Sequence, residues 1–263
     1  MILARIKVFF INLKCFLASK KHRVSTFGDI FKVSDECDLI YIARLNRHNR
    51  YKRGIFYGVN LLAEEYSLDK ISNTDNGILI DCGANIGELG FWAKKQNLHY
   101  IGFEPESNEF KCLSFNSGEN SRLENIALWN KNEKLRFNSL PNSGDSTVFE
   151  IEESTTSFEV DGKRLDTVIE SFDINGPRIL KVEAEGAEPE VLEGAKQILK
   201  YIDFITVDCG PERGINQEYT FIAVNNFMLE NNFSLVVAKF ERVTMLYKNN
   251  LRDTEKYLNI DNC

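Results

Sequence analysis

One stretch, residues 78–90 with the sequence ILIDCGANIGELG, limits what this chain can fold into more than any other. It opens with a short apolar run, Ile78–Ile80, of the length typical of a buried parallel strand. Apolar residues at helical spacing follow at 89–93, and between the two segments lie Gly83, Gly87 and Gly90. Glycine permits a tight turn and lets a ligand approach the backbone, and a helix start presents unpaired N–H groups. The stretch therefore predicts a strand, a turn and a helix that border a nucleotide-binding crevice.

A second apolar run, Tyr100–Phe103, predicts the neighbouring strand and leads directly into Glu104. Glu104 lies 23 residues beyond Asp81, close to the spacing at which a carboxylate holds ribose hydroxyls in Rossmann-type folds. The glycines do not follow the G-x-G-x-x-G spacing of a dinucleotide site. The pattern is instead similar to the S-adenosylmethionine sites of class I methyltransferases, so we favour that cofactor over a dinucleotide.

Two acids follow a third predicted strand, Ile179–Val182. Glu183 and Glu185 are two residues apart and would point to the same side of an extended chain. Gly186 ends the strand, and a helix is expected from Glu188, where acids and a proline suit the first turn. Carboxylates at a strand end are poorly solvated unless something uses them, so they are candidate catalytic groups. The alternative is that they form ion pairs with arginine or lysine from the N-terminal part of the chain.

Composition indicates one sizeable α/β core with an accessory segment. The chain has 263 residues, of which 43% are hydrophobic, and its net charge of −7 argues against a nucleic-acid binder. The six cysteines form no C-x-x-C pair and the three histidines do not cluster near them, so we expect no metal site and reduced thiols in a cytoplasmic protein. We divide the chain into a helical lead-in (1–70), a core (71–250) and a polar tail (251–263).

Residues 1–23 carry apolar side chains at helical spacing together with several lysines. Lys14 interrupts the apolar run, which makes the segment a poor signal peptide, and the run is too short to span a membrane. We expect a helix that packs on the core or on a second subunit. The alternative is a basic amphipathic helix on an anionic membrane, at its inner face.

Residues 24–70 are expected to be mostly helical and contain a local excess of basic side chains. Five cations lie within ten residues of an otherwise acidic chain: Arg44, Arg47, Arg50, Lys52 and Arg53. We expect some of them, with Arg50 and Arg53 as the main candidates, to bind an anionic group of the substrate. The alternative is a solvated helix face. Ser146, in the polar loop 141–147, is a further candidate to reach the crevice.

The rest of the chain predicts an alternation of strands and helices. We expect helices at 107–116, from 164 and at 217–231, and strands at 123–129, 135–137, 147–151 and 204–208. Residues 233–238 and 243–247 predict a closing antiparallel pair. With the strands above, this indicates a mostly parallel sheet covered by helices on both faces.

Five motifs occur in order along the chain: DCGANIG, GFEPE, NIALW, LDTV and LKVEAEGAEPEVLEGA. Together they resemble the FkbM family of S-adenosylmethionine-dependent methyltransferases, from about Tyr41 to Tyr247. The resemblance implies a seven-stranded class I methyltransferase sheet with a reversed final strand. It also implies O-methylation, often of sugars in surface glycans or of secondary-metabolite hydroxyls.

The resemblance assigns roles to individual positions. Glu104 matches the ribose-binding acid, Asn125 to Ala127 match the segment near the adenine, and Glu185 with Gly186 matches the family's Glu-Gly pair. Glu183 and Ala184 stand where the family usually has aspartate and valine. The cofactor loop is matched by Asp81, Gly83, Ala84, Asn85 and Gly87.

Transfer to an alcohol calls for a group that removes the hydroxyl proton. Glu185 is the first candidate for this role and Glu183 the second. The acceptor would be a glycan or another small molecule. Two rival classes remain: a nucleotide-sugar oxidoreductase or epimerase on a similar sheet, and a non-catalytic binding module. The number of subunits stays open.

Overall fold

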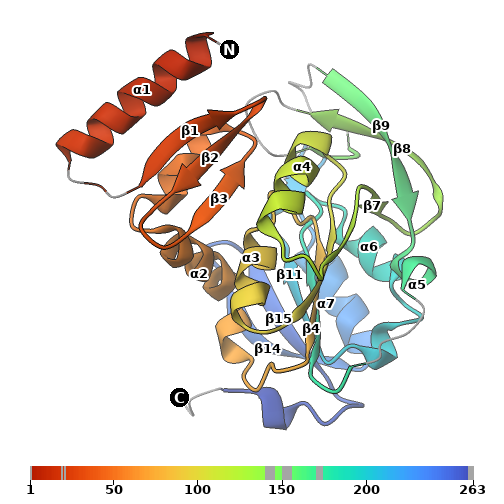
Figure 1. The fold of residues 1–263 in the computed structure, drawn as a ribbon. Helices are drawn as coiled ribbons and strands as arrows, with labels where there is room; N and C mark the ends of the chain where they lie inside the picture. The colour runs from red at the N-terminus through yellow and green to blue at the C-terminus, as the bar shows by residue number, and fades with distance from the viewer. Residues whose placement is uncertain are drawn as a thin grey trace.

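The computed structural model describes residues 2–18, 20, 22–139, 146–149, 156–169 and 174–259, and a seven-stranded sheet forms its centre (Figure 1). The strand order is β14-β15-β11-β10-β4-β5-β6. The five strands from β11 to β6 are parallel, whereas β15 is antiparallel to β11 and to β14. The predicted sheet with a reversed closing pair is therefore confirmed. The bounds are β4 Ile78–Cys82, β5 His99–Phe103, β6 Arg122–Glu124, β10 Arg178–Val182, β11 Phe204–Asp208, β14 Phe233–Lys239 and β15 Thr244–Asn249.

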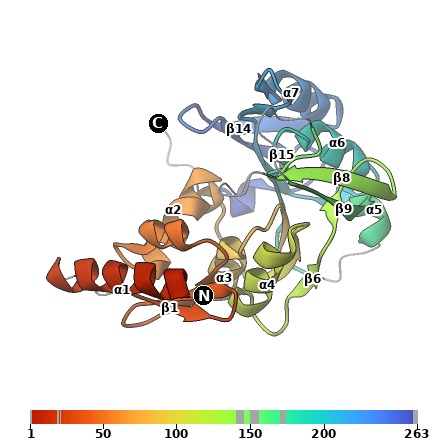
Figure 2. The same cartoon turned by 90° about the horizontal axis from the view of Figure 1, so that it is seen from above.

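Helices cover both faces of this sheet (Figure 2). Side chains alternate along each strand, so Leu79 packs on one face while Ile78 and Ile80 pack on the other. The first face is covered by α2 (Ile55–Glu65), α3 (Glu88–Lys95) and α4 (Ser107–Asn116). The second is covered by α5 (Leu165–Val168), α6 (Glu188–Gly194) and α7 (Phe221–Glu230). Every residue of β4 and β11 is buried, which fits the apolar residues with which both strands begin.

The N-terminal part differs from the expected, mostly helical lead-in. Helix α1 (Ile2–Leu17) is present, but residues 23–42 form an antiparallel sheet of β1 (Arg23–Phe27), β2 (Ile30–Ser34) and β3 (Leu39–Ile42). Ile40 and Ile42 are buried and alternate with more exposed neighbours, which is the period of a strand. The helical prediction holds only for η1 (Leu45–Tyr51), α2 and η2 (Leu68–Lys70).

The strand expected at 123–129 divides into two. β6 ends at Glu124 in the main sheet, and the chain then joins a smaller sheet as β7 (Ala127–Leu128) beside β9 (Thr156–Lys163) and β8 (Glu133–Ser139). The division occurs at Asn125, whose amide donates to the carbonyls of Glu104 (2.7 Å) and Pro105 (3.0 Å) and so bends the chain away from the sheet. β9 was not predicted. Of the strand expected at 147–151, the structure describes 147–149, with one bridge from Thr147 to Asn138.

The remaining elements are two short strands and two 3-10 turns in the C-terminal part of the described chain. Strands β12 (Pro211–Arg213) and β13 (Glu218–Tyr219) form a small antiparallel hairpin after β11. Single 3-10 turns occur at η3 (Leu199–Tyr201) and η4 (Glu255–Tyr257). Within the described ranges, no helix has the length and apolar content needed to cross a membrane.

Candidate active site

A polar crevice of about 600 Å³ opens where β4 and β10 end. This is the edge at which open α/β sheets bind ligands. The crevice joins a narrow, mostly apolar slot of about 70 Å³, and the two share Gly83, Asn85, Glu183 and Glu185. The crevice is lined by cations and acids from distant parts of the chain, including Arg44, Arg47, Arg50, Asp81, Glu88, Lys181, Glu212 and Arg242.

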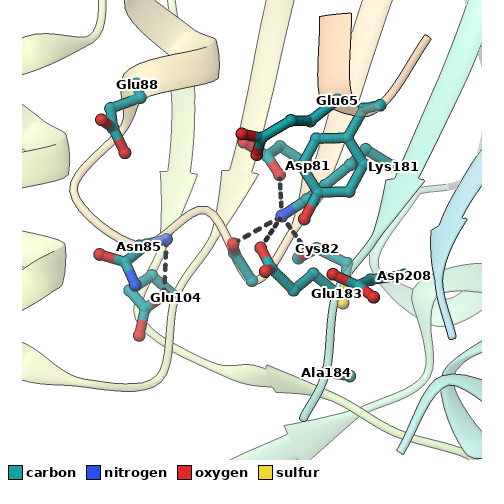
Figure 3. A network of polar contacts seen from close by, with 12 residues as sticks. Glu65, Asp81, Cys82, Asn85, Glu88, Glu104, Lys181, Glu183, Ala184 and Asp208 are labelled. Carbon is teal, nitrogen blue, oxygen red and sulfur yellow. Dashed lines mark hydrogen bonds and ion pairs between the residues drawn. The ribbon is translucent and has the colours of Figure 1, made fainter. Parts of the chain in front are cut away.

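The buried ammonium of Lys181 holds the floor of the crevice together (Figure 3). Its Nζ donates to the backbone carbonyls of Cys82 (3.1 Å) and Gly83 (2.8 Å). It also forms ion pairs with Asp81 (3.0 Å) and Glu183 (3.1 Å). The opposite charges raise the pKa of Lys181 although burial alone would lower it, so this lysine remains charged. One side chain thus ties the end of β4 to the end of β10.

Glu183 is committed to ion pairs at both carboxylate oxygens. Oε2 pairs with Lys181, and Oε1 accepts a hydrogen bond from Arg242 in the turn between β14 and β15. Arg242 also donates to Asp208 at the end of β11 (2.7 Å). Burial alone would raise the pKa of Glu183, but Lys181 and Arg242 outweigh it and hold that pKa at about 2. The alternative of ion pairing therefore holds for Glu183, with Lys181 of the core and Arg242 of the closing hairpin as the partners and not residues of the lead-in.

Glu104 lies at the end of β5, buried beside the slot. One of its carboxylate oxygens accepts the N–H of Asn85 at 2.7 Å (Figure 3). The other accepts the N–H of Glu106 at 2.8 Å. Burial raises the pKa of Glu104 to about 7. Each oxygen keeps a lone pair for a further donor, so the carboxylate can receive two hydroxyls from a ligand in the slot.

The two loop glycines are required by close contacts within the chain. A Cβ at Gly83 would lie 2.0 Å from the carbonyl oxygen of Glu183, and φ there is +71°. A Cβ at Gly87, where φ is +85°, would meet Leu113 of α4 at 2.8 Å. Gly83 is thus needed for the approach of β10 to the loop.

Three arginines in and just before η1 line the crevice but are paired with acids of α3 and α4. Arg47 (2.5 Å) and Arg50 (3.3 Å) contact Oε2 of Glu88, and Arg44 contacts Glu109 at 3.0 Å. Burial would raise the pKa of Glu88, but Arg47 and Arg50 lower it. The basic segment therefore forms ion pairs with Glu88 in the first turn of α3 and with Glu109 of α4.

Arg53 is separated from this group, which corrects its assignment to the crevice. Its guanidinium lies 4.3 Å from the centre of the Tyr57 ring. It lines another hollow, together with Asp35 and Lys52. Of the predicted pair, only Arg50 borders the crevice.

The other predicted residues either line the crevice or the slot, or support the backbone around them. Ala84 lines the crevice, Ala127 lines the slot, and Glu185 borders both. Glu185 has a φ of +49°, so it does not continue the extended chain, but it lines the same two cavities as Glu183. Asn125 donates hydrogen bonds to backbone carbonyls and lines neither the crevice nor the slot. Ser146 lines the slot, where its hydroxyl donates to Glu106.

Three important side chains were not predicted: Lys181, Arg242 and Glu212. Lys181 stood out in the sequence as one cation inside an apolar strand, which is a usable signal. Glu212, in β12, lines the crevice, and its buried Oε2 has no hydrogen-bond partner among the described residues. Burial, followed by the charges of Asp208 and Glu183, raises the pKa of Glu212 to about 8.

The strand order, the glycine loop and the crevice together define the class I methyltransferase fold. A family model described as the methyltransferase FkbM domain matches residues 81–235, and the chain belongs to this family. The chain is similar to the hexuronic acid methyltransferase AglP of Haloferax volcanii, with 28% identity over 155 residues that cover 57% of this chain and 60% of that protein.

Solved structures of similar fold include two of magnesium protoporphyrin IX methyltransferase from Synechocystis. The one with bound S-adenosylmethionine has a TM-score of 0.42 and 12% identity, covering 76% of this chain and 81% of the other. The one with bound SAH has a TM-score of 0.46 and 8% identity, covering 78% and 87%. A ribosomal protein L11 methylase from Lactobacillus delbrueckii has a TM-score of 0.42 and 11% identity, covering 73% and 77%.

Proposed function

We propose that this protein is an S-adenosylmethionine-dependent O-methyltransferase that acts in the cytoplasm on a sugar hydroxyl of a surface glycan or its precursor. The observation that carries the proposal is the two-part cavity at the strand ends. A narrow apolar slot beside a buried carboxylate suits an adenosine, and the polar crevice joined to it suits a hydroxylated acceptor. The family match and the similarity to a hexuronic acid methyltransferase support the same reaction class.

The cofactor would lie across the junction of the slot and the crevice. Glu104 would accept the two ribose hydroxyls, while Ala127 and its apolar neighbours would border the adenine. Asp81, Gly83, Ala84 and Asn85 line the crevice, on the side where the methionine part would extend. Gly87 would act through the packing of α3 on α4. When bound, S-adenosylmethionine supplies the electrophilic methyl group of a sulfonium.

The acceptor would occupy the polar crevice between η1 and the acids of β10 and β12. Arg50 is less buried than Arg44 and Arg47, and it contacts Glu88 at a longer distance than Arg47 does, so its guanidinium is the one best placed to turn to a ligand. A guanidinium suits a sugar carboxylate or phosphate, which it can bind with two parallel hydrogen bonds. A secondary-metabolite hydroxyl is the alternative acceptor, since it would use the same chemistry.

The acids of the crevice are the candidates to remove the hydroxyl proton of the acceptor. During methyl transfer a carboxylate of the crevice would accept the hydroxyl proton of the acceptor. Glu183 is a weak base because Lys181 and Arg242 hold it ionised. We assign the proton to Glu212, whose raised pKa makes its ionised form a stronger base. Glu185 is the alternative.

Calorimetric titration of the protein with S-adenosylmethionine, NAD and NADP tests the cofactor. We expect binding of S-adenosylmethionine alone; binding of a dinucleotide instead would support an oxidoreductase or epimerase. Transfer of a labelled methyl group to uronic acid-containing and neutral oligosaccharides then tests the reaction. A protein that binds the cofactor but transfers no methyl group to sugars or to hydroxylated metabolites would be a binding module.

Arg50→Gln and Arg53→Gln form a matched pair for the acceptor site. Both remove one charge from the same segment, but only Arg50 lines the crevice. Arg50→Gln should raise the acceptor KM about tenfold, the usual effect of one hydrogen bond to a charged group, with unchanged cofactor affinity. Arg53→Gln should leave both constants unchanged. Equal effects of the two variants would refute the placement of the acceptor.

A further inference from the structure

Helix α1 attaches to the rest of the protein along one narrow stripe. It lies along the outer side of the small β1–β3 sheet, at the margin of the molecule in both views (Figures 1 and 2). Val8 and Cys15 are buried there. The Asn12 side chain is fixed to the backbone of Val24, donating to its carbonyl at 2.7 Å and accepting from its N–H at 2.8 Å. These contacts fix which side of the helix faces outward.

The outward side of α1 is apolar. Eight large hydrophobic side chains of this helix are between 41% and 77% exposed. At about 100° per residue they form one continuous arc of roughly 140°, opposite the stripe that holds Val8 and Cys15. They are Ile2, Leu3, Ile6, Phe9, Phe10, Leu13, Phe16 and Leu17. So large an exposed apolar surface on one helix marks an interaction site.

Cations border this arc on both sides. On the same helical projection Arg5 lies at one edge, and Lys7 and Lys14 lie at the other. All three are exposed, and the helix contains no acidic residue. The chain as a whole has a net charge of −7, so α1 carries charge opposite to that of the protein it belongs to. An apolar face between two cationic edges is the pattern of a helix that lies in the plane of a membrane interface.

We propose that α1 docks this protein on an anionic lipid surface, with the apolar arc among the acyl chains and Arg5, Lys7 and Lys14 at the headgroups. The helix has 16 residues, about 24 Å at 1.5 Å per residue, so it lies on a bilayer and does not cross one. A second copy of the chain fits less well. Two such helices packed face to face would bring their cationic edges together with no acid to balance them.

The position of α1 brings the crevice close to that surface. Lys7, Lys14 and Asn46 line one hollow between α1 and η1, and Asn46 also lines the polar crevice. A protein docked through α1 would therefore hold its acceptor site near acceptors carried at the membrane. The docking itself does not depend on which reaction the crevice performs.

Flotation of the full chain with vesicles tests the proposal. We expect the protein to float with phosphatidylcholine vesicles that contain about 30% phosphatidylglycerol, and not with phosphatidylcholine alone. Binding should fall at about 0.5 M NaCl, because salt screens the attraction between cations and headgroups. Absence of flotation at low salt overturns the proposal.

Two double variants test the apolar arc and the cationic edges of α1 separately, and a third variant is the control. Phe9→Gln/Phe16→Gln and Lys7→Glu/Lys14→Glu should each reduce the bound fraction at least about tenfold. Phe240→Gln removes a side chain that is 75% exposed at the far hairpin and should have no effect. Because the altered side chains are exposed, all variants should keep the wild-type melting temperature and S-adenosylmethionine affinity.

Light scattering in the absence of lipid distinguishes a second copy from a membrane. We expect the wild type and Phe9→Gln/Phe16→Gln to have the same mass. A wild-type dimer that becomes a monomer in this variant, combined with no flotation, would assign the apolar arc to self-association and overturn the membrane proposal. The cofactor titration of the same samples reports separately on the proposed enzyme activity.

Discussion

Replacement of Lys181 by methionine tests whether its ammonium holds the crevice together. Methionine has a similar length and apolar volume but no charge, so Asp81 and Glu183 would lose a partner at 3.0 and 3.1 Å. The carbonyls of Cys82 and Gly83 would lose their donor as well. Removing one member of a buried ion pair costs about 3–5 kcal/mol, because the remaining charge is left uncompensated.

The pKa of Glu183 gives a second value for the unfolding free energy that is lost with the ammonium. Its pKa falls from an ordinary value of 4.5 to about 2 in the folded protein. A shift of that size corresponds to roughly 3 kcal/mol, shared between Lys181 and Arg242. Because the folded pKa is the lower one, this stabilisation is present above about pH 4.5 and is lost as the pH falls toward 2. We therefore expect a loss of about 3–4 kcal/mol at neutral pH.

The loss in Lys181→Met should depend on pH with a defined sign. Without the ammonium, burial raises the pKa of Asp81 and Glu183, so both carboxyls are protonated more easily in the folded variant. Protonation removes the uncompensated charge, and the difference in unfolding free energy from wild type should shrink as the pH is lowered from about 7.5 to about 5.

Urea unfolding at the two pH values measures this difference. Lys196→Met is the matched control, since Lys196 is 54% exposed and forms a surface ion pair with Glu193, and it should change stability by less than about 0.5 kcal/mol. A loss below about 1 kcal/mol in Lys181→Met, or an equal loss at both pH values, would refute the account of this network.

Three further variants probe the loop, the slot and the base. Gly83→Ala should lower the unfolding free energy by about 2 kcal/mol or more, because its Cβ would meet the Glu183 carbonyl and φ is +71°; an unchanged melting curve would contradict this. Glu104→Gln should weaken S-adenosylmethionine binding in calorimetry about 10- to 100-fold, and a Kd within about twofold of wild type would exclude a ribose contact. Glu212→Gln should reduce kcat about 100-fold or more at constant cofactor affinity, and it should abolish the rise of wild-type activity toward pH 8. The control Glu218→Gln, on the same hairpin, should have neither effect. If Glu212→Gln keeps the wild-type pH profile, the base is Glu185.

The sequence by itself determined the elements whose cause is local. The apolar run of β4, the glycine turn and the start of α3 follow from residues within one stretch, and α4 begins and ends where its pattern predicts. The end of β5 placed Glu104 at the strand edge for the same reason. In each case the side-chain period and the backbone conformation that glycine permits depend on a few neighbouring residues, so both can be recognised from the sequence alone.

The tertiary structure alone decided which charges meet. Glu183 is paired with Arg242, which is 59 residues away in the sequence, and η1 directs Arg50 into the crevice while Arg53, three residues later, stacks on Tyr57. Glu212 borders the crevice from β12, the short strand that follows the end of β11. The energy of an ion pair depends on distance and burial between elements that are remote in the chain, and no local pattern encodes either quantity.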